Sequence, residues 1–249
     1  MTNLAYMVRE DWGQHGTEMV SQSAVIREWA GSAPYVFAVV DARKFMTDRP
    51  ADRETVDYLL GDSSERSIVS IGELARLTRE GRRLDDPLLI IHPYDARELD
   101  AIREAVQAAN VARAFVMLWS PADRIRPWLD SRGALNLHTG GQAQEPDPLM
   151  VAAAKMMVDE EYNGLHSGNG KDAVIQLVRA FEHQGYAVDV NVWLRAYFAA
   201  GGSFRHSESV SKLMTEMAAG VQHRVKPRYR DDIFEILSNR ASEVSAEAE

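Results

Sequence analysis

Apolar runs and one segment of helical period alternate within residues 87–121. The first run, Leu88–Ile91, stops at His92, and the second, Ala114–Trp119, stops at Ser120. Between them, apolar residues recur at the spacing of one helix face: Leu99, Ile102, Val106 and Ala109. Two short apolar runs around one amphipathic helix are typical of parallel strands that are buried on both faces and joined by a crossover helix.

The same alternation extends over the first half of the chain. The further predicted strands are Tyr35–Val40 (the first of the chain), Ser67–Ile71 and Ala134–Leu137. Three further predicted helices are Thr17–Ala30, Gly72–Glu80 and Asp123–Arg132. Another short helix, which contains Val56, Leu59 and Leu60, follows the polar connector Thr47–Arg53. Strands that alternate with helices predict a Rossmann-like α/β domain over residues 1–142, with a mostly parallel sheet and helices on both faces.

Strand signals disappear after a polar linker, Gly140–Pro148, which is rich in glycine and proline. The predicted helices of this half are Leu149–Glu161, Lys171–Gln184, Val190–Ala200 capped by Asp189, Ser207–Ala219 and Asp231–Leu237. They predict an all-α bundle over residues 148–240. The last residues, 241–249, are mostly Ala, Ser and Glu, and we expect a disordered tail there.

Composition narrows the function classes. A net charge of −9 argues against a nucleic-acid or anionic-membrane surface over the whole chain. The absence of cysteine excludes disulfides, zinc–thiolate sites and thiol nucleophiles. The apolar runs are too short for a membrane span, and the start lacks the pattern of a signal peptide. We therefore expect a cytoplasmic protein, and the scarcity of lysine beside arginine is typical of a GC-rich bacterial genome.

Polar residues follow several predicted strands, and the carboxyl ends of parallel strands form the edge where ligands bind. This edge would collect Asp41, His92, Asp95, Ser120, Asp123 and His138. The carboxylates of Asp41 and Asp123 could hold Mg²⁺ or Mn²⁺, with Asp95 as a further catalytic group, for phosphodiester hydrolysis. His92, Ser120 and His138 would then contact the substrate. The competing interpretation for the two histidines is a hydrogen-bonded residue at the end of a strand.

The arrangement of Asp41 after a strand and of Ser120 and Asp123 after a later strand is similar to that of PIN/NYN-type nucleases. It departs from that family where Arg43, Lys44 and Phe45 follow Asp41, because the family has an Asn soon after its first Asp. The same aspartates also have a structural interpretation. Asp95 and Asp123 precede predicted helices, where an acidic side chain caps free N–H groups, and Asp41 ends a strand.

Two cationic segments of the second half are candidate phosphate contacts. Lys171 follows a glycine-rich turn at a predicted helix start, although the segment does not match a Walker A motif. Residues 223–230 contain Arg228 and Arg230 and could bind a nucleic-acid backbone, another phosphate ligand or an acidic partner. The competing interpretation is a solvated connector neutralised by Asp231 and Asp232.

Two further segments resemble known families. Ile71–Glu80 resembles the first helix of a MerR-type helix-turn-helix regulator, which implies DNA binding, but the residues that follow lead into a predicted strand. Asp159–Arg230 resembles a helical module of uncharacterised actinobacterial proteins, a family to which no function is attached.

No GxSxG elbow or GxGxxG turn is present, so serine hydrolase chemistry and a nicotinamide or flavin cofactor have no support. We therefore expect a regulatory or protein-interaction protein that uses no cofactor. The helical domain would contact a protein partner or a second copy of the chain. A surface for this contact could include Trp193, Tyr197, Phe198, Met214 and Met217, although we expect most of these residues to be core. The alternative is the Mg²⁺- or Mn²⁺-dependent nuclease or phosphohydrolase described above.

Overall fold

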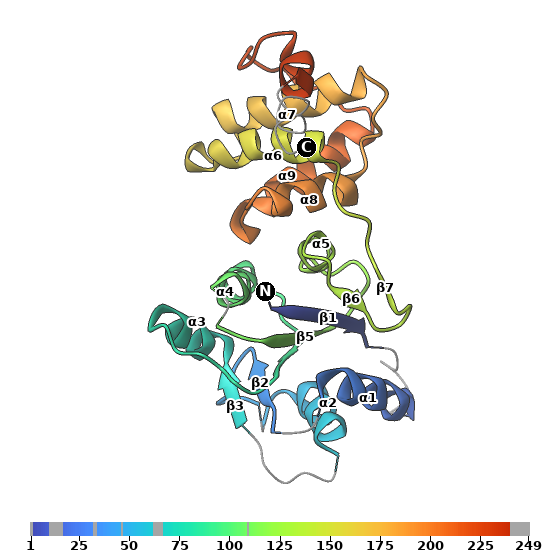
Figure 1. Cartoon of the computed structure of the whole chain (residues 1–249). Coiled ribbons are helices and arrows are strands. Elements are labelled where there is room, and N and C mark those ends of the chain that lie inside the picture. Colours follow the sequence, from blue (N-terminus) through green and yellow to red (C-terminus); the bar gives the residue numbers. More distant parts are fainter. Residues whose placement is uncertain are drawn as a thin grey trace. The chain divides into compact units, whose positions relative to one another are not determined.

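A computed structural model describes residues 2–9, 17–31, 34–45, 47–61, 67–108 and 110–239. The chain divides into two compact units, Met1–Ala143 and Gln144–Glu249 (Figure 1). The predicted tail 241–249 and Ala109 lie outside the described residues. Within them, no helix combines the length and apolar character that crossing a membrane requires.

The first unit is built on one sheet with the strand order β3-β2-β4-β5-β1-β6-β7. Its strands are β1 Asn3–Val8, β2 Val36–Val39, β3 Ser67–Ser70, β4 Leu88–Ile91, β5 Arg113–Leu118, β6 Leu135–Asn136 and β7 Gly141–Gln142. All neighbouring strands pair in parallel except β7, which pairs antiparallel with β6. The predicted α/β class and the mostly parallel sheet are confirmed.

Strand β1 was not predicted, so Tyr35–Val40 is not the first strand of the chain. Each residue of β1 pairs with β5, for example Ala5 with Phe115, and β6 lies on its other side. Four of its residues are buried, because this strand occupies the sheet interior. A second correction concerns Gly141–Gln142, which forms β7 within the stretch predicted as a linker.

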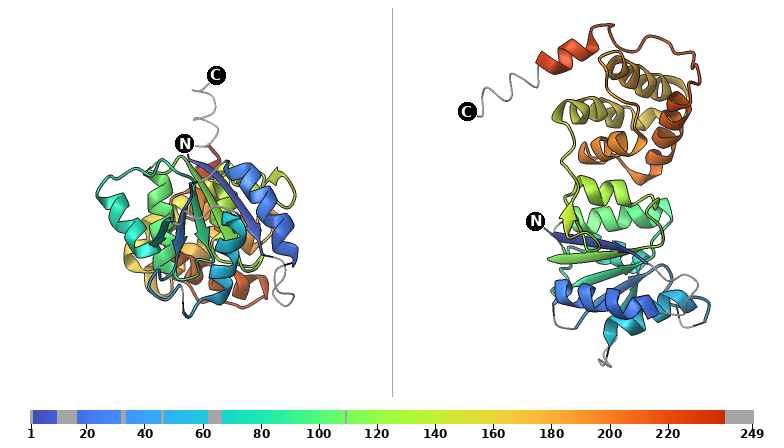
Figure 2. Two further views of the ribbon diagram at one scale, coloured as in Figure 1. Left: turned by 90° about the horizontal axis from the view of Figure 1, so that it is seen from below. Right: turned by 90° about the vertical axis from the view of Figure 1, so that its right-hand side faces the viewer.

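Helices cover both faces of this sheet (Figure 2). They are α1 Thr17–Ala30, α2 Pro50–Leu60, α3 Ile71–Arg79, α4 Ala96–Gln107 and α5 Arg126–Ser131. Helices α1 and α2 pack on one face, where their apolar residues join alternate strand residues in one core. Helix α2 begins at Pro50, inside the predicted polar connector, because proline suits the first turn of a helix.

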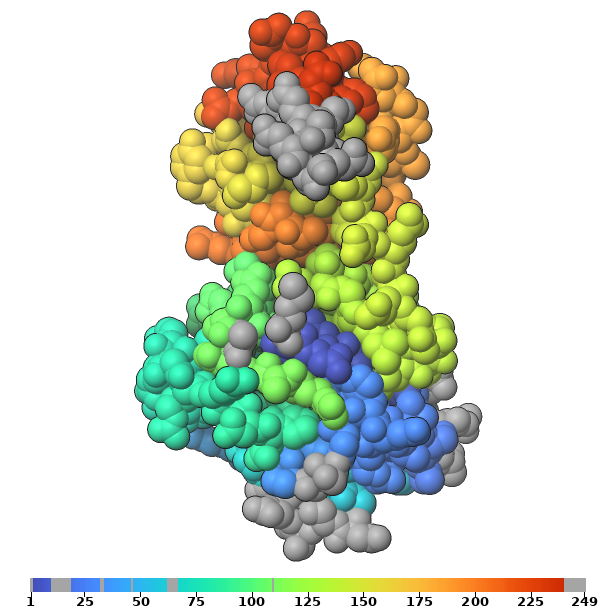
Figure 3. Space-filling view, in the orientation of Figure 1, coloured from blue at the N-terminus to red at the C-terminus, as the bar shows by residue number. Residues whose placement is uncertain are grey.

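Helix α3 contains the segment that resembles a MerR-type helix. The side chain of Ser70 caps it by accepting a 3.1 Å hydrogen bond from the N–H of Glu73, and it packs against α4. The next element is strand β4, not a recognition helix. The outer side of helix α3 lies at the surface of the unit (teal in Figure 3). The segment is therefore a surface helix of the α/β layers rather than the first half of a helix-turn-helix.

The second unit is helical, as predicted. Its elements are α6 Pro148–Asp159, the short 3₁₀ helix η1 Glu161–Asn163, α7 Gly168–Glu182, α8 Val190–Ala199 and α9 Phe204–Ala218, and residues 233–239 are also helical. Asp189 caps α8 by accepting hydrogen bonds from Asn191 and Val192. Helix α7 begins at Gly168, within the glycine-rich turn that precedes the predicted helix Lys171–Gln184. Gly170 approaches the chain closely there, since a Cβ on it would lie 2.2 Å from the carbonyl oxygen of Gly164.

The aromatic and methionine side chains that were candidates for a partner surface form the core of this unit. Trp193, Tyr197, Phe198, Met214 and Met217 are all buried. Most of these residues were expected to be core, and the apolar area of all five is used in packing the helices against one another.

Candidate functional site

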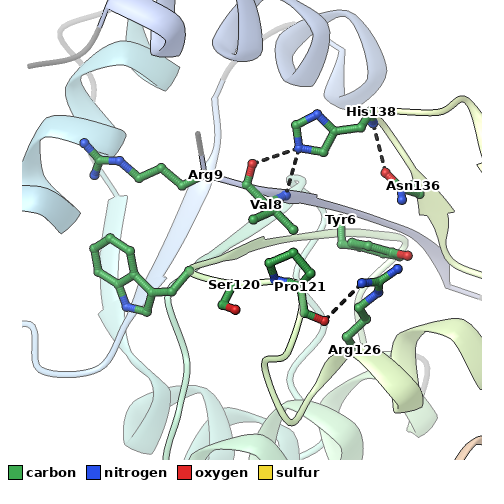
Figure 4. A pocket seen from close by; sticks show the side chains of 9 residues that line it. Tyr6, Val8, Arg9, Ser120, Pro121, Arg126, Asn136 and His138 are labelled. Atoms are coloured by element: carbon green, nitrogen blue, oxygen red, sulfur yellow. Dashed lines mark hydrogen bonds between the residues drawn. The ribbon is translucent and has the colours of Figure 1, made fainter. Parts of the chain in front are cut away.

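A surface pocket of about 590 Å³ lies at the carboxyl edge of the sheet, where β1, β5 and β6 end (Figure 4). It is lined by side chains from these strands, from the segments that follow them and from α5: Tyr6, Val8, Arg9, Trp119, Ser120, Pro121, Arg126, Asn136 and His138. Ligands of open parallel sheets bind at this edge. The pocket is the first element of the candidate site.

The segment after β5 forms one wall, and its own hydrogen bonds fix its shape. The N–H of Trp119 donates to Asp123 Oδ2 at 2.7 Å, and the N–H of Ala122 donates to Ser120 Oγ at 3.1 Å. Arg126 Nη1 donates to the carbonyl oxygen of Pro121 at 3.0 Å. The guanidinium of Arg126 is thus positioned by the loop that it faces.

The opposite wall comes from β1 and β6. The ring of His138 follows β6, and its Nε2 lies 3.2 Å from the N and 2.8 Å from the O of Val8. Asn136 Oδ1 accepts the N–H of His138 at 3.0 Å. The hydroxyl of Tyr6 donates to Asp130 Oδ1 at 2.8 Å, and burial, followed by the nearby Asp130 carboxylate, raises the pKa of Tyr6.

Arg9 follows β1 and is almost completely buried. Its guanidinium donates to the carbonyl oxygen of Ala51 at 2.8 Å and to Thr55 Oγ1 at 2.9 Å, and it pairs with Glu54. Arg9 therefore fastens the end of β1 to helix α2. In Figure 4 its guanidinium lies on the opposite side of the labelled group from Arg126.

A buried histidine–aspartate pair adjoins the pocket. His92 follows β4 with φ of 47°, a left-handed conformation that is uncommon for residues other than glycine. Its Nδ1 lies 2.7 Å from Asp52 Oδ1, and its ring stacks on Trp119, a residue of the pocket wall. The guanidinium carbon of Arg9 lies 5.8 Å from the Trp119 ring centroid. Strained, buried and paired groups of this kind concentrate at functional sites.

Burial lowers the pKa of His92, although Asp52 acts in the opposite direction. The imidazole is therefore neutral near neutral pH, and the Asp52 carboxylate places the hydrogen on Nδ1. Nε2 of His92 and Oδ2 of Asp52 are buried and have no hydrogen-bond partner among the described residues. The pair thus keeps a lone pair on Nε2 as a buried hydrogen-bond acceptor.

The pair also lies at a point where the order of the strands reverses. The connection after β2 leads outward to β3 through α2, whereas the connection after β4 leads the other way to β5 through α4. Crevices at such points bind ligands in open α/β sheets. Asp52 of α2 and His92 meet there, and Trp119 links them to the pocket at the end of β5.

Of the residues predicted for this edge, Ser120 and His138 line the pocket and His92 lies behind its wall. The three aspartates bind backbone N–H groups of their own segments. Asp41 accepts from Arg43 and Lys44, Asp95 caps α4, and Asp123 accepts from Trp119. Across the described part of the chain, no three acidic or histidine side chains are grouped so that they could hold a metal ion.

The predicted cations of the second half lie in the second unit. Lys171 is in the first turn of α7, which begins at Gly168, three residues before the predicted start. Arg228 donates to Glu160 Oε1 at 2.6 and 3.0 Å, and Arg230 pairs with Asp232 at 2.7 Å. Both arginines thus have carboxylate partners within their own unit, and Asp232 was one of the two expected to neutralise this segment.

Sequence reasoning missed Tyr6, Arg9, Asp52 and Arg126. A usable signal existed for the first two, because the apolar run Leu4–Val8 stops at Arg9 in the same way as the recognised strands stop at polar residues. Asp52 and Arg126 lie in helices, and their place at the edge depends on contacts between distant segments.

The chain matches no protein-family model, and searches among curated proteins and solved structures found no match either.

Proposed function

We propose that the chain is a ligand-responsive regulatory protein whose first unit binds a small organic anion in the edge pocket. The main support for this proposal is the set of polar groups that line the pocket. Its described residues include the guanidinium groups of Arg9 and Arg126 and the hydroxyl of Ser120, and no carboxylate. Guanidinium and hydroxyl groups are the donors that recognise carboxylates and phosphates.

Arg126 is the main anion contact in this proposal. The hydrogen bond to the Pro121 carbonyl holds its guanidinium in place, so little side-chain ordering is needed when a ligand binds. Ser120 lies in the same closed loop and supplies a hydroxyl. Arg9 stays bound to α2, where Glu54 balances its charge, so it holds the end of β1 in place and is not a direct anion contact.

The proposed output of binding is a protein contact made by the helical unit, with another protein or with a second copy of the chain. This part of the proposal stands on the lack of a complete catalytic motif in the sequence. Because the aromatic residues first considered for such a surface are core, the contact would use the exposed residues of the unit, such as Tyr162.

Calorimetric titration of the full chain with inorganic phosphate and with citrate tests the binding step. We expect saturable binding that Arg126→Ala weakens about ten- to a hundred-fold, because hydrogen bonds to charged groups contribute about 1.5–3 kcal/mol. Arg132→Ala is the matched control, since Arg132 directly follows helix α5 but does not line this pocket.

Two results would overturn the proposal. One is the absence of binding of either anion to the wild-type chain. The other is an equal loss of affinity in Arg126→Ala and Arg132→Ala, which would show a general effect of net charge. Circular dichroism of both variants establishes that they are folded.

The phosphohydrolase alternative stays a prediction. It requires Mn²⁺ binding that depends on Asp41 and Asp123, and both side chains hold backbone N–H groups of their own segments. Titration of Mn²⁺ into the wild type, Asp41→Asn and Asp123→Asn tests it. Binding that both variants abolish would favour the enzyme over the regulatory protein.

A further inference from the structure

A second, smaller pocket of about 210 Å³ adjoins the edge pocket. The two are continuous in their lining, because Tyr6, Arg126 and Asn136 contribute to both. The second pocket extends towards β7 and is also lined by Asp130, Thr139, Gly141, Gln142 and Ala143. Unlike the first pocket, it contains a carboxylate.

The acceptors of the second pocket come from two side chains. Asp130 Oδ1 accepts a hydrogen bond from the Tyr6 hydroxyl, and Asp130 Oδ2 lies 3.8 Å from Arg126 Nε. A carboxylate offers about four acceptor positions, so further donors can bind to it. Gln142 Nε2 donates to the carbonyl oxygen of Gly133 at 2.6 Å, which leaves its Oε1 as an acceptor.

Donors lie beside these acceptors. Thr139 Oγ1 accepts the N–H of Gly141 at 3.3 Å, so its own hydroxyl hydrogen can be donated. Asn136 Oδ1 accepts the N–H of His138, and its Nδ2 carries two donors. A ligand group that both donates and accepts satisfies such a mixed set, and the hydroxyl is the simplest group of this kind.

We infer that the ligand is a phosphorylated sugar. Its phosphate lies beside Arg126 and Ser120 in the first pocket, and its hydroxyls bind Asp130 and the amide side chains of the second. In dinucleotide-binding α/β folds a carboxylate likewise binds a ribose hydroxyl. The charge of Asp130 also disfavours a second anionic group there. This inference rests on the proposed function, because it assigns the remainder of the same ligand.

The test is a calorimetric comparison of inorganic phosphate, ribose 5-phosphate and ribose on the full chain. We expect the wild type to bind ribose 5-phosphate about tenfold or more tightly than phosphate. Asp130→Asn should remove most of this preference by weakening ribose 5-phosphate binding, and phosphate affinity should not fall, because the variant removes a negative charge 3.8 Å from Arg126 while Asn still accepts the Tyr6 hydroxyl. Glu104→Gln, an exposed change of the same kind on α4, is the matched control.

The outcomes separate the two proposals. Equal affinity for phosphate and ribose 5-phosphate overturns the sugar assignment and leaves anion binding in place, whereas no binding of either overturns both. A loss of phosphate affinity in Asp130→Asn equal to its loss of ribose 5-phosphate affinity also overturns the sugar assignment. Should Asp130→Asn not fold, Gln142→Ala on the exposed edge strand serves instead, with the same selective loss expected.

Discussion

The imidazole of His92 lies flat against the indole of Trp119, with ring centroids 3.4 Å apart and ring planes 10° apart. Trp119 lines the edge pocket, and the hydrogen-bond partner of His92 is Asp52 in helix α2. The stack therefore connects the pocket wall to the helix that follows β2. Arg9 also connects the edge pocket, which it lines, to helix α2, where it donates to the carbonyl oxygen of Ala51.

The pH dependence of stability should report on His92. Its pKa in the folded chain is lowered by burial, so above a pH of about 6.5 the ring is neutral in both states. As the pH falls below that value, the unfolded chain binds the proton first, and the folded state loses stability until the pH passes the folded pKa. The contribution changes by at most about 1.4 kcal/mol per pH unit. Urea unfolding at about pH 7.5 and pH 5.5 measures it.

His92→Asn is the control for this measurement, because asparagine tolerates a positive φ and does not titrate. We expect the variant to be less stable at both pH values and to lose less stability on acidification than the wild type. An unchanged loss would show that other groups cause the acid sensitivity.

Removal of Asp52, the hydrogen-bond partner of His92, should lower the free energy of unfolding. Asp52→Ala leaves Nδ1 of His92 buried without an acceptor, and the unmet hydrogen bond costs about 1–3 kcal/mol. Asp52→Asn keeps an acceptor oxygen and should lose less. The free energies of unfolding of the two variants at neutral pH measure the difference, and equal losses would argue against the hydrogen bond as the cause.

Most of the fold could be predicted because strands buried on both faces give continuous apolar runs. The runs Leu88–Ile91 and Ala114–Trp119 stand out for this reason, and the helix between them has a clear apolar stripe. The position of β1 between β5 and β6 could not be predicted, because strand order depends on packing between distant segments and leaves no local pattern.

The site was predictable only in part for the same reason. His92, Ser120 and His138 follow strands directly, so the edge rule places them correctly. Asp52 reaches His92 from a helix forty positions away in sequence, and its local pattern is only that of an acidic residue in a first helical turn. Backbone capping, which the sequence offered as the alternative for Asp95, is its observed role.

Gly202 should not accept a side chain. A Cβ at this position would lie 2.3 Å from the buried ring of Tyr197, whose hydroxyl is held by Glu161. Overpacking of this kind costs about 1–3 kcal/mol, so Gly202→Ala should lower the melting temperature. Gly72→Ala is the contrasting variant, since its nearest neighbour is 3.8 Å away and alanine favours the helix. A neutral Gly202→Ala would contradict the close approach.

The segment 223–230 is held on helix α7, and weakening that attachment should expose it without affecting the first unit. Gln176 Oε1 accepts the N–H groups of both Arg228 and Tyr229, and Asp172 accepts that of Lys226. Gln176→Ala removes two of these hydrogen bonds, each worth about 0.5–1.5 kcal/mol. We therefore expect amide hydrogen exchange at Arg228 and Tyr229 to speed up about tenfold or more, while the β4 and β5 amides keep their wild-type rates. Unchanged exchange at Arg228 and Tyr229 would mean that the remaining contacts, such as the Arg228–Glu160 ion pair and the Asp172–Lys226 hydrogen bond, are enough to hold the segment.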